Sequence, residues 1–249
     1  MLFRRMFCRN FSEDDPRIFD RAVSLYVKNI VVGLFCTVFM MLFSYMQESL
    51  INSGVSCVLS FLCVFSAAFI SVLLMYVPMI ASIHRARIFS NWHALRSDVL
   101  SLSFKWATLR ALLFSGFGYA LISLPSYKAI IKIAFTVASF LGWQYMIFKA
   151  INIVCNMGSD EKIPLGKVIT KKSDFFIETA MCTFGLLVAF PFIIEEYFFK
   201  EYGTISRWPE AQKILFSQNV PLLYTFFVLP FTICLACCCY HEALEYKNQ

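Results

Sequence analysis

The sequence has 249 residues, of which 59% are hydrophobic and only 15% are charged, and its mean hydropathy is +0.67. Soluble domains carry about 45–50% apolar and about 25% charged residues, so this composition argues against a water-soluble protein and equally against a disordered one. The net charge of +6 comes without a long basic run. It indicates membrane loops with a positive bias rather than nucleic-acid binding.

The N-terminal segment predicts a retained anchor rather than a cleaved signal. Arg4 and Arg5 lie near the start, but three acidic residues follow at 13–15, and the first apolar run begins only near Ile30. A secretory signal would place a short apolar core and a small-residue cleavage site directly after the basic residues. We therefore expect the first apolar segment to stay in the protein.

Six apolar stretches are long enough to cross a bilayer, whose hydrocarbon core of about 30 Å takes roughly 20 helical residues. They cover about 30–46, 54–83, 107–124, 129–150, 175–199 and 219–240. The sequence predicts an all-α polytopic membrane protein whose six transmembrane helices form three hairpins. Because every loop is shorter than the usual lower limit of about 50 residues for a domain, residues 1–249 are expected to form one membrane domain with no separate soluble domain.

The basic residues predict the orientation of these spans. Sixteen of the 22 Lys and Arg residues fall in the segments on the side of the N-terminus, five fall on the opposite side, and Arg110 lies inside a span. Loops rich in Lys and Arg stay in the cytoplasm, so both termini are predicted to be cytoplasmic. A bacterial inner membrane is favoured, with a eukaryotic endomembrane or the mitochondrial inner membrane as alternatives.

An amphipathic segment lies between the second and third spans, where apolar residues recur at spacings of three and four. These residues are Ile88, Trp92, Leu95, Val99, Leu102 and Trp106. The stripe predicts a helix on the cytoplasmic membrane surface, which either leads the chain into the bilayer or receives a protein partner. His84 and His93 are interpreted as polar groups of this segment. A second interfacial helix is expected before the first span, starting at Asp15-Pro16.

Two charges fall within predicted spans, where a charge is costly and by default suggests a function. Arg110 lies about one turn into the third span and Glu178 about one turn into the fifth, both near the cytoplasmic boundary. They are candidates for an intramembrane ion pair that would hold two hairpins in register. The alternative is that each side chain reaches the interface independently.

The ten cysteines predict no disulfide framework, because none lies in the predicted outer loops. Four of them cluster at the end of the sixth span, at Cys234 and 237–239, and His241 follows. Three interpretations stay open for this cluster: apolar packing, a soft metal site that lacks a second ligand pair, and lipid modification at a membrane edge. Apolar packing is favoured, and no metal or cofactor is predicted.

The sequence predicts function less well than architecture, because no motif in it carries chemistry by itself. The favoured hypothesis is a non-enzymatic multi-pass membrane protein that acts as a scaffold, an assembly factor or a regulatory component of a membrane complex. The alternative is a small transporter or channel, and a membrane-embedded enzyme ranks lowest. The expected partners are the lipid bilayer and either other proteins or further copies of this chain, bound through transmembrane helices.

Overall fold

The computed structural model of the chain describes residues 18–35, 38, 57–84, 92–156, 163–171, 173–186, 228–242 and 244. This part of the chain is helical and contains no strand, which confirms the all-α class. Two of its helices, Val58–Ile83 and Lys128–Cys155, are long and apolar enough to cross a membrane. They coincide with the second and fourth predicted spans and indicate membrane association, whereas the arrangement of six spans stays a prediction.

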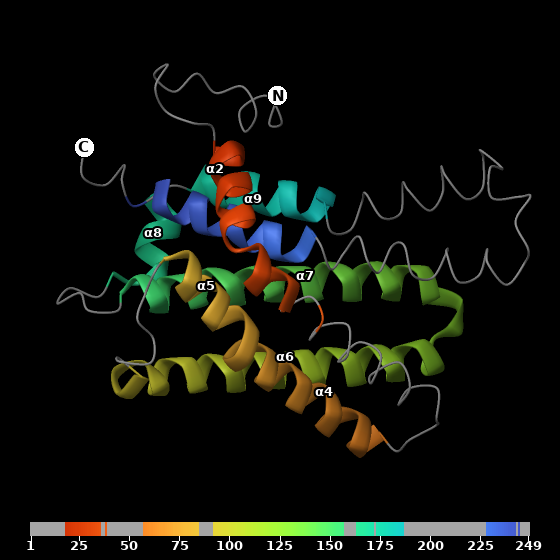
Figure 1. Cartoon of the computed structure of the whole chain (residues 1–249). Coiled ribbons are helices and arrows are strands. Elements are labelled where there is room, and N and C mark those ends of the chain that lie inside the picture. Colours follow the sequence, from red (N-terminus) through yellow and green to blue (C-terminus); the bar gives the residue numbers. More distant parts are fainter. Residues whose placement is uncertain are drawn as a thin grey trace, which may run out of the picture. The chain divides into compact units, whose positions relative to one another are not determined.

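The described residues form the following helices, most of which are labelled in Figure 1. They are α2 (Ile18–Lys28), α4 (Cys57–Ser71), η1 (Val72–Tyr76), α5 (Val77–Ile83), α6 (Trp92–Ser123), η2 (Pro125–Tyr127), α7 (Lys128–Cys155), α8 (Leu165–Lys171) and α9 (Ser173–Phe184). A further apolar helix covers Val228–Glu242.

The chain divides into two compact units, and each is described by itself. Unit 1 combines Met1–Thr37 with Ile169–Gln249, and unit 2 is the continuous segment Val38–Val168. The first boundary falls inside the first predicted span (30–46), so the start of that span and the second span belong to different units. The single membrane domain over 1–249 stays a prediction.

Unit 2 is built on three long helical segments. α4, η1 and α5 continue into one another, and in this combined helix α4 packs against α6 while α5 packs against α7. α6 and α7 form an antiparallel hairpin through the short turn η2 (Figure 1). The sequence explains where α6 ends, because a residue before proline is pushed out of helical geometry. Leu124 accordingly has φ −130° and ψ 63° before Pro125.

The third predicted span and the amphipathic segment before it form one helix, because α6 runs unbroken from Trp92 to Ser123. No glycine or proline occurs in it before Gly116, so nothing local interrupts the helix. Three members of the predicted stripe, Val99, Leu102 and Trp106, are buried. Ile88 lies outside the described residues, as do the side chains of Trp92 and Leu95. The position of this stripe at a membrane surface stays a prediction.

The combined helix contains a π-helical turn at its centre. In η1 the backbone N–H of Val77 donates to the carbonyl of Val72, five residues back, instead of to that of Leu73. Pro78 follows and has no N–H to offer. The regular α-helical bonding is therefore interrupted in a candidate membrane span, because neither Val77 nor Pro78 donates to the Leu73 carbonyl.

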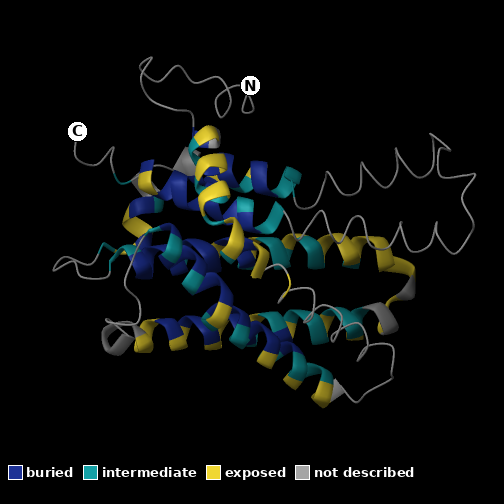
Figure 2. Cartoon of the chain, in the orientation of Figure 1, coloured by how far each residue is buried: buried dark blue, intermediate teal, exposed yellow. Residues whose placement is uncertain are grey.

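Unit 1 holds the N-terminal and C-terminal helices against each other in antiparallel order. Tyr26 of α2 meets Phe231 edge to face, with 6.1 Å between ring centroids, and a Cβ at Gly33 would lie 3.3 Å from the Cβ of Pro230. A small core joins α2, α9 and the helix Val228–Glu242. Its buried members are Ile18, Ala22, Cys182, Leu235, Cys238 and Cys239. This core explains why the C-terminal helix is buried over most of its length (Figure 2).

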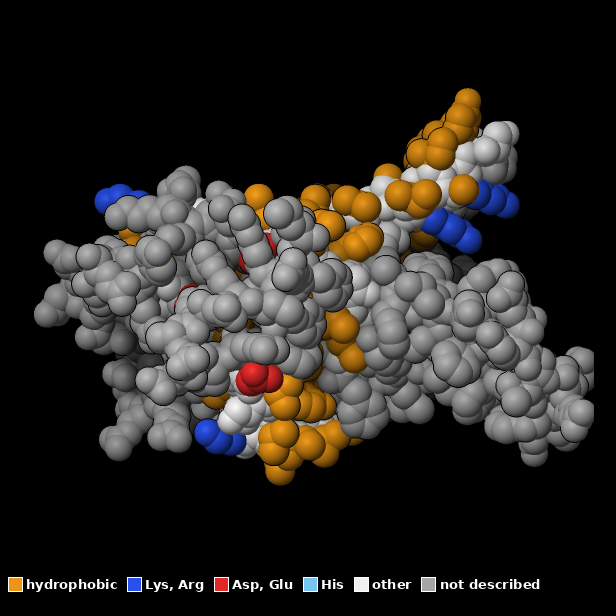
Figure 3. Space-filling view, turned by 90° about the horizontal axis from the view of Figure 1, so that it is seen from above, with side chains coloured by type: hydrophobic (Ala, Val, Ile, Leu, Met, Phe, Trp, Pro, Cys, Tyr) orange, Lys and Arg blue, Asp and Glu red, His pale blue; other side chains and the backbone are white. Residues whose placement is uncertain are grey.

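Apolar side chains also cover much of the outside of unit 2. On α7 they recur every three or four residues as one exposed stripe, with exposed fractions from 39% to 64%. The members of this outer stripe are Ile130, Ile133, Val137, Leu141 and Tyr145. In the space-filling view most of the coloured side chains are hydrophobic, and Lys and Arg occur at only a few places (Figure 3). A helix with an apolar outer face is typical of contact with lipid rather than water.

Candidate functional site

Arg110 lies level with the middle of α7. The two helices α6 and α7 approach closely at Gly142, where a Cβ would lie 3.1 Å from Leu109 Cδ2 and 3.1 Å from Trp106 Cζ3. Gly142 lies midway along α7, and Arg110 follows Leu109 directly. The predicted position of Arg110 near the cytoplasmic boundary of a membrane stays a prediction.

The surroundings of Arg110 are mostly aromatic. Its guanidinium carbon lies 5.9 Å from the centroid of the Phe135 ring, and Phe135 itself stacks on Phe117 at 4.2 Å between centroids. Arg110 also interacts electrostatically with Tyr76. Among the residues that the structure describes, it forms no ion pair and no hydrogen bond. A face-on ring attracts a cation, but it leaves the N–H donors of the guanidinium without acceptors.

Two further polar groups of unit 2 lie on the side of α7 that meets α6 and η1. Trp143 donates a hydrogen bond from Nε1 to the Tyr76 hydroxyl at 3.3 Å. The Ser139 hydroxyl oxygen is buried and has no hydrogen-bond partner within the described residues. Ser139 is four residues after Phe135 and three before Gly142, so helical spacing places it on the face that contacts Arg110 and its neighbours. Arg110 and Ser139 thus form a polar spot among aromatic rings.

Glu178, the predicted partner of Arg110, lies in α9 of unit 1, and its side chain is buried. Arg110 belongs to unit 2. Since each unit is described by itself, the ion pair between them stays a prediction. Thr179 and Thr183 of the same helix are buried as well.

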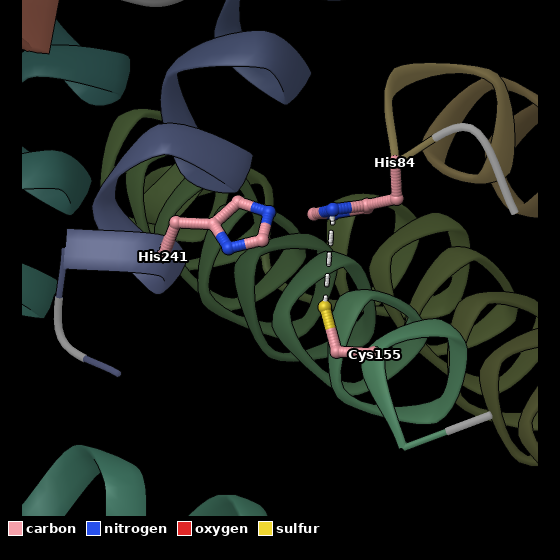
Figure 4. A group of neighbouring side chains, drawn as sticks. All are labelled: His84, Cys155 and His241. Carbon is pink, nitrogen blue, oxygen red and sulfur yellow. Dashed lines mark hydrogen bonds between the residues drawn. The ribbon is translucent and has the colours of Figure 1, made fainter. Parts of the chain in front are cut away.

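A histidine and a cysteine meet at the ends of α5 and α7. The Cys155 sulfur lies 3.8 Å from Nε2 and 4.0 Å from Nδ1 of His84 (Figure 4). These distances are nearly equal, so neither ring nitrogen points directly at the sulfur as an aligned acceptor or metal ligand would. His241, which Figure 4 also draws, belongs to unit 1. Within unit 2 the two residues therefore form a packed pair, and two ligands are fewer than a metal site requires.

Sequence reasoning did not find this pair, because the two residues are 71 positions apart and no spacing rule joins them. Hydrogen bonds from two asparagines, here called the asparagine clamp, hold the turn that follows α7 beside this pair. Asn152 and Asn156 both donate from Nδ2 to the carbonyl of Ile163 at 2.9 Å, and the Ile163 N–H donates to Asn156 Oδ1 at 3.1 Å. This clamp fixes the end of α7 and so fixes the position of Cys155.

The cysteine cluster at the C-terminal end is part of the interior of unit 1. Cys234, Cys237, Cys238 and Cys239 are all buried. Their burial supports apolar packing, the favoured interpretation of the sequence, because a buried thiol behaves as a small apolar side chain. Lipid modification of this cluster would first require these buried thiols to become exposed.

One ion pair connects the two chain segments of unit 1. Arg21 Nη1 of α2 lies 3.4 Å from Glu242 Oε2, with the two side chains 32% and 11% exposed. Partly exposed pairs contribute about 0–1 kcal/mol. We therefore expect Arg21→Gln to lower the free energy of unfolding by less than about 1 kcal/mol in low salt. Thermal unfolding in detergent would measure this loss, and the exchanged pair R21E/E242R should recover most of it; a larger loss that the exchange does not recover would mean that Arg21 contributes mainly through packing.

Comparison of the chain with protein-family models, with curated proteins and with solved structures finds no match.

Proposed function

We propose that this protein is a non-enzymatic multi-pass membrane protein that works through partners, as a scaffold, an assembly factor or a regulatory component of a membrane complex. The observation that supports it best is the outer stripe of α7, which repeats apolar side chains at helical spacing on an exposed face. In water such a face would be an aggregation surface. In a bilayer it is available to lipid or to the helices of another protein.

The limited burial of the candidate spans supports the same proposal. In the most apolar stretches of Val58–Ile83 and Lys128–Cys155, only 33% and 22% of the residues are buried inside the chain. A core helix of a soluble protein would be buried over most of such a stretch. The remaining apolar surface favours a chain whose six predicted spans, with both termini cytoplasmic, are surrounded by lipid and partner helices.

Purification in a mild detergent followed by native mass measurement tests this proposal. We expect the protein to remain in a complex, either with a second protein or with further copies of itself. Leu141→Glu and Ile133→Glu, both on the outer stripe, should each disrupt the complex or lower the amount of protein in the membrane fraction. The reason is that a charge on a lipid-facing helix costs several kcal/mol. Arg96→Glu, at an exposed position of α6, is the control. A monomer that carries a solute across reconstituted vesicles would contradict the proposal.

A small transporter or channel is the second candidate, and two polar features at mid-span favour it. A π-helical turn before Pro78 interrupts the regular α-helical bonding of the span Val58–Ile83. In addition, Gln144 of α7 is only 5% exposed, and both its amide oxygen and its amide nitrogen lack partners within the described residues. Irregular helices with free carbonyls and buried polar side chains at mid-membrane are typical of solute pathways.

A further inference from the structure

The guanidinium of Arg110 carries a positive charge that no described carboxylate of unit 2 neutralises. It lies level with the middle of α7, 5.9 Å from the centroid of the Phe135 ring, and it interacts electrostatically with Tyr76. In a bilayer centred on α7, Arg110 would lie about 15 Å from either edge of the hydrocarbon core, which is beyond the reach of an arginine side chain.

A desolvated guanidinium without a counter-charge is costly, because its five N–H donors and its charge both lose water. The stacked rings of Phe135 and Phe117 offset only part of that cost. The buried hydroxyl of Ser139 on the adjacent face of α7 also has no partner. The guanidinium of Arg110 and the hydroxyl of Ser139 both lack a hydrogen-bond acceptor within the described residues, and a bound anion would supply one to each.

We propose that Arg110 and Ser139 bind a small monovalent anion inside unit 2, near the middle of the candidate membrane spans. One guanidinium neutralises one negative charge, and the Ser139 O–H supplies a directed hydrogen bond. A phosphate dianion would bring a second charge that no described residue of this spot neutralises. A lipid phosphate stays at headgroup depth. The ligand class is therefore a free halide-like anion. This inference does not depend on the scaffold proposal, because a bound anion would stabilise the helices in either functional class.

Thermal unfolding of the full chain in detergent tests the site, with sodium chloride replaced stepwise by sodium gluconate at constant ionic strength. Gluconate is too large and too hydrated to enter an aromatic site. We expect chloride to raise the Tm in a saturable manner, by roughly 5–10 °C at a hundredfold excess over its Kd. Arg110→Gln should abolish this dependence, Arg110→Lys should keep it with weaker binding, and Ser139→Ala should raise the Kd several-fold.

The control is Arg96→Gln, which removes an exposed arginine from the same helix and should leave the chloride dependence unchanged. If Arg110→Gln does not fold, the Arg110→Lys and Ser139→Ala titrations still decide, because both must shift the apparent Kd. A wild-type Tm that does not distinguish chloride from gluconate would overturn the proposal. So would a double variant R110Q/E178Q that is more stable than both single variants and indifferent to chloride, since Glu178 would then be the counter-charge.

Discussion

Replacing Gly142 by valine is expected to lower the free energy of unfolding by about 1–3 kcal/mol or more, because the added side chain has no room between α6 and α7. Even a single Cβ at this position would lie 3.1 Å from atoms of both Leu109 and Trp106. The ring of Trp106 is buried and cannot rotate away freely. Leu109 is 41% exposed and can turn outward, so the strain falls mainly on the Trp106 ring and on the packing around Arg110.

Gly116 on α6 offers a matched control, since a Cβ there meets nothing within 4 Å. Gly116→Val should be neutral or slightly stabilising, because glycine is the weaker helix former. Thermal or denaturant unfolding in the same detergent compares the two variants. Equal effects at the two glycines would mean that the close approach of α6 to α7 does not contribute to stability.

Replacing Gln144 is expected to change stability in opposite directions according to the new side chain. Gln144 is 5% exposed, and neither end of its amide has a partner in the described part of unit 2. An unpaired buried polar group costs about 1–3 kcal/mol, so Gln144→Met should be neutral or stabilising. Gln144→Glu should be strongly destabilising at neutral pH, because an unpaired buried carboxylate costs several kcal/mol.

Comparison of Gln144→Glu with Gln144→Met separates the charge from the loss of the amide, because the two new side chains are similar in length. Thermal or denaturant unfolding in the same detergent measures both variants. If Gln144→Met instead destabilises the protein by more than about 1 kcal/mol, Gln144 has a hydrogen-bond partner in the membrane, and the case for a solute pathway weakens.

The sequence by itself predicted the helical class and, among its six expected spans, the two that the described residues contain as helices long enough to cross a membrane. Val58–Ile83 and Lys128–Cys155 follow from uninterrupted apolar runs, and such runs form helices wherever backbone groups cannot bond to water. The end of α6 before Pro125 was equally local, since proline restricts the residue that precedes it. These features depend on residues that are close together in the sequence, so a local sequence pattern is enough to predict them.

Tertiary structure alone decided where the polar groups lie. The position of Arg110 along α7 depends on how α6 packs against α7, and the two helices approach closely at Gly142. The contact of His84 with Cys155 joins positions 71 residues apart. The stripe residues Val99 and Trp106 face the protein interior because α6 is packed on its apolar side. Hydropathy is a sum over one segment, whereas register and burial depend on which other segment packs against it, and no local pattern in a single sequence records that choice.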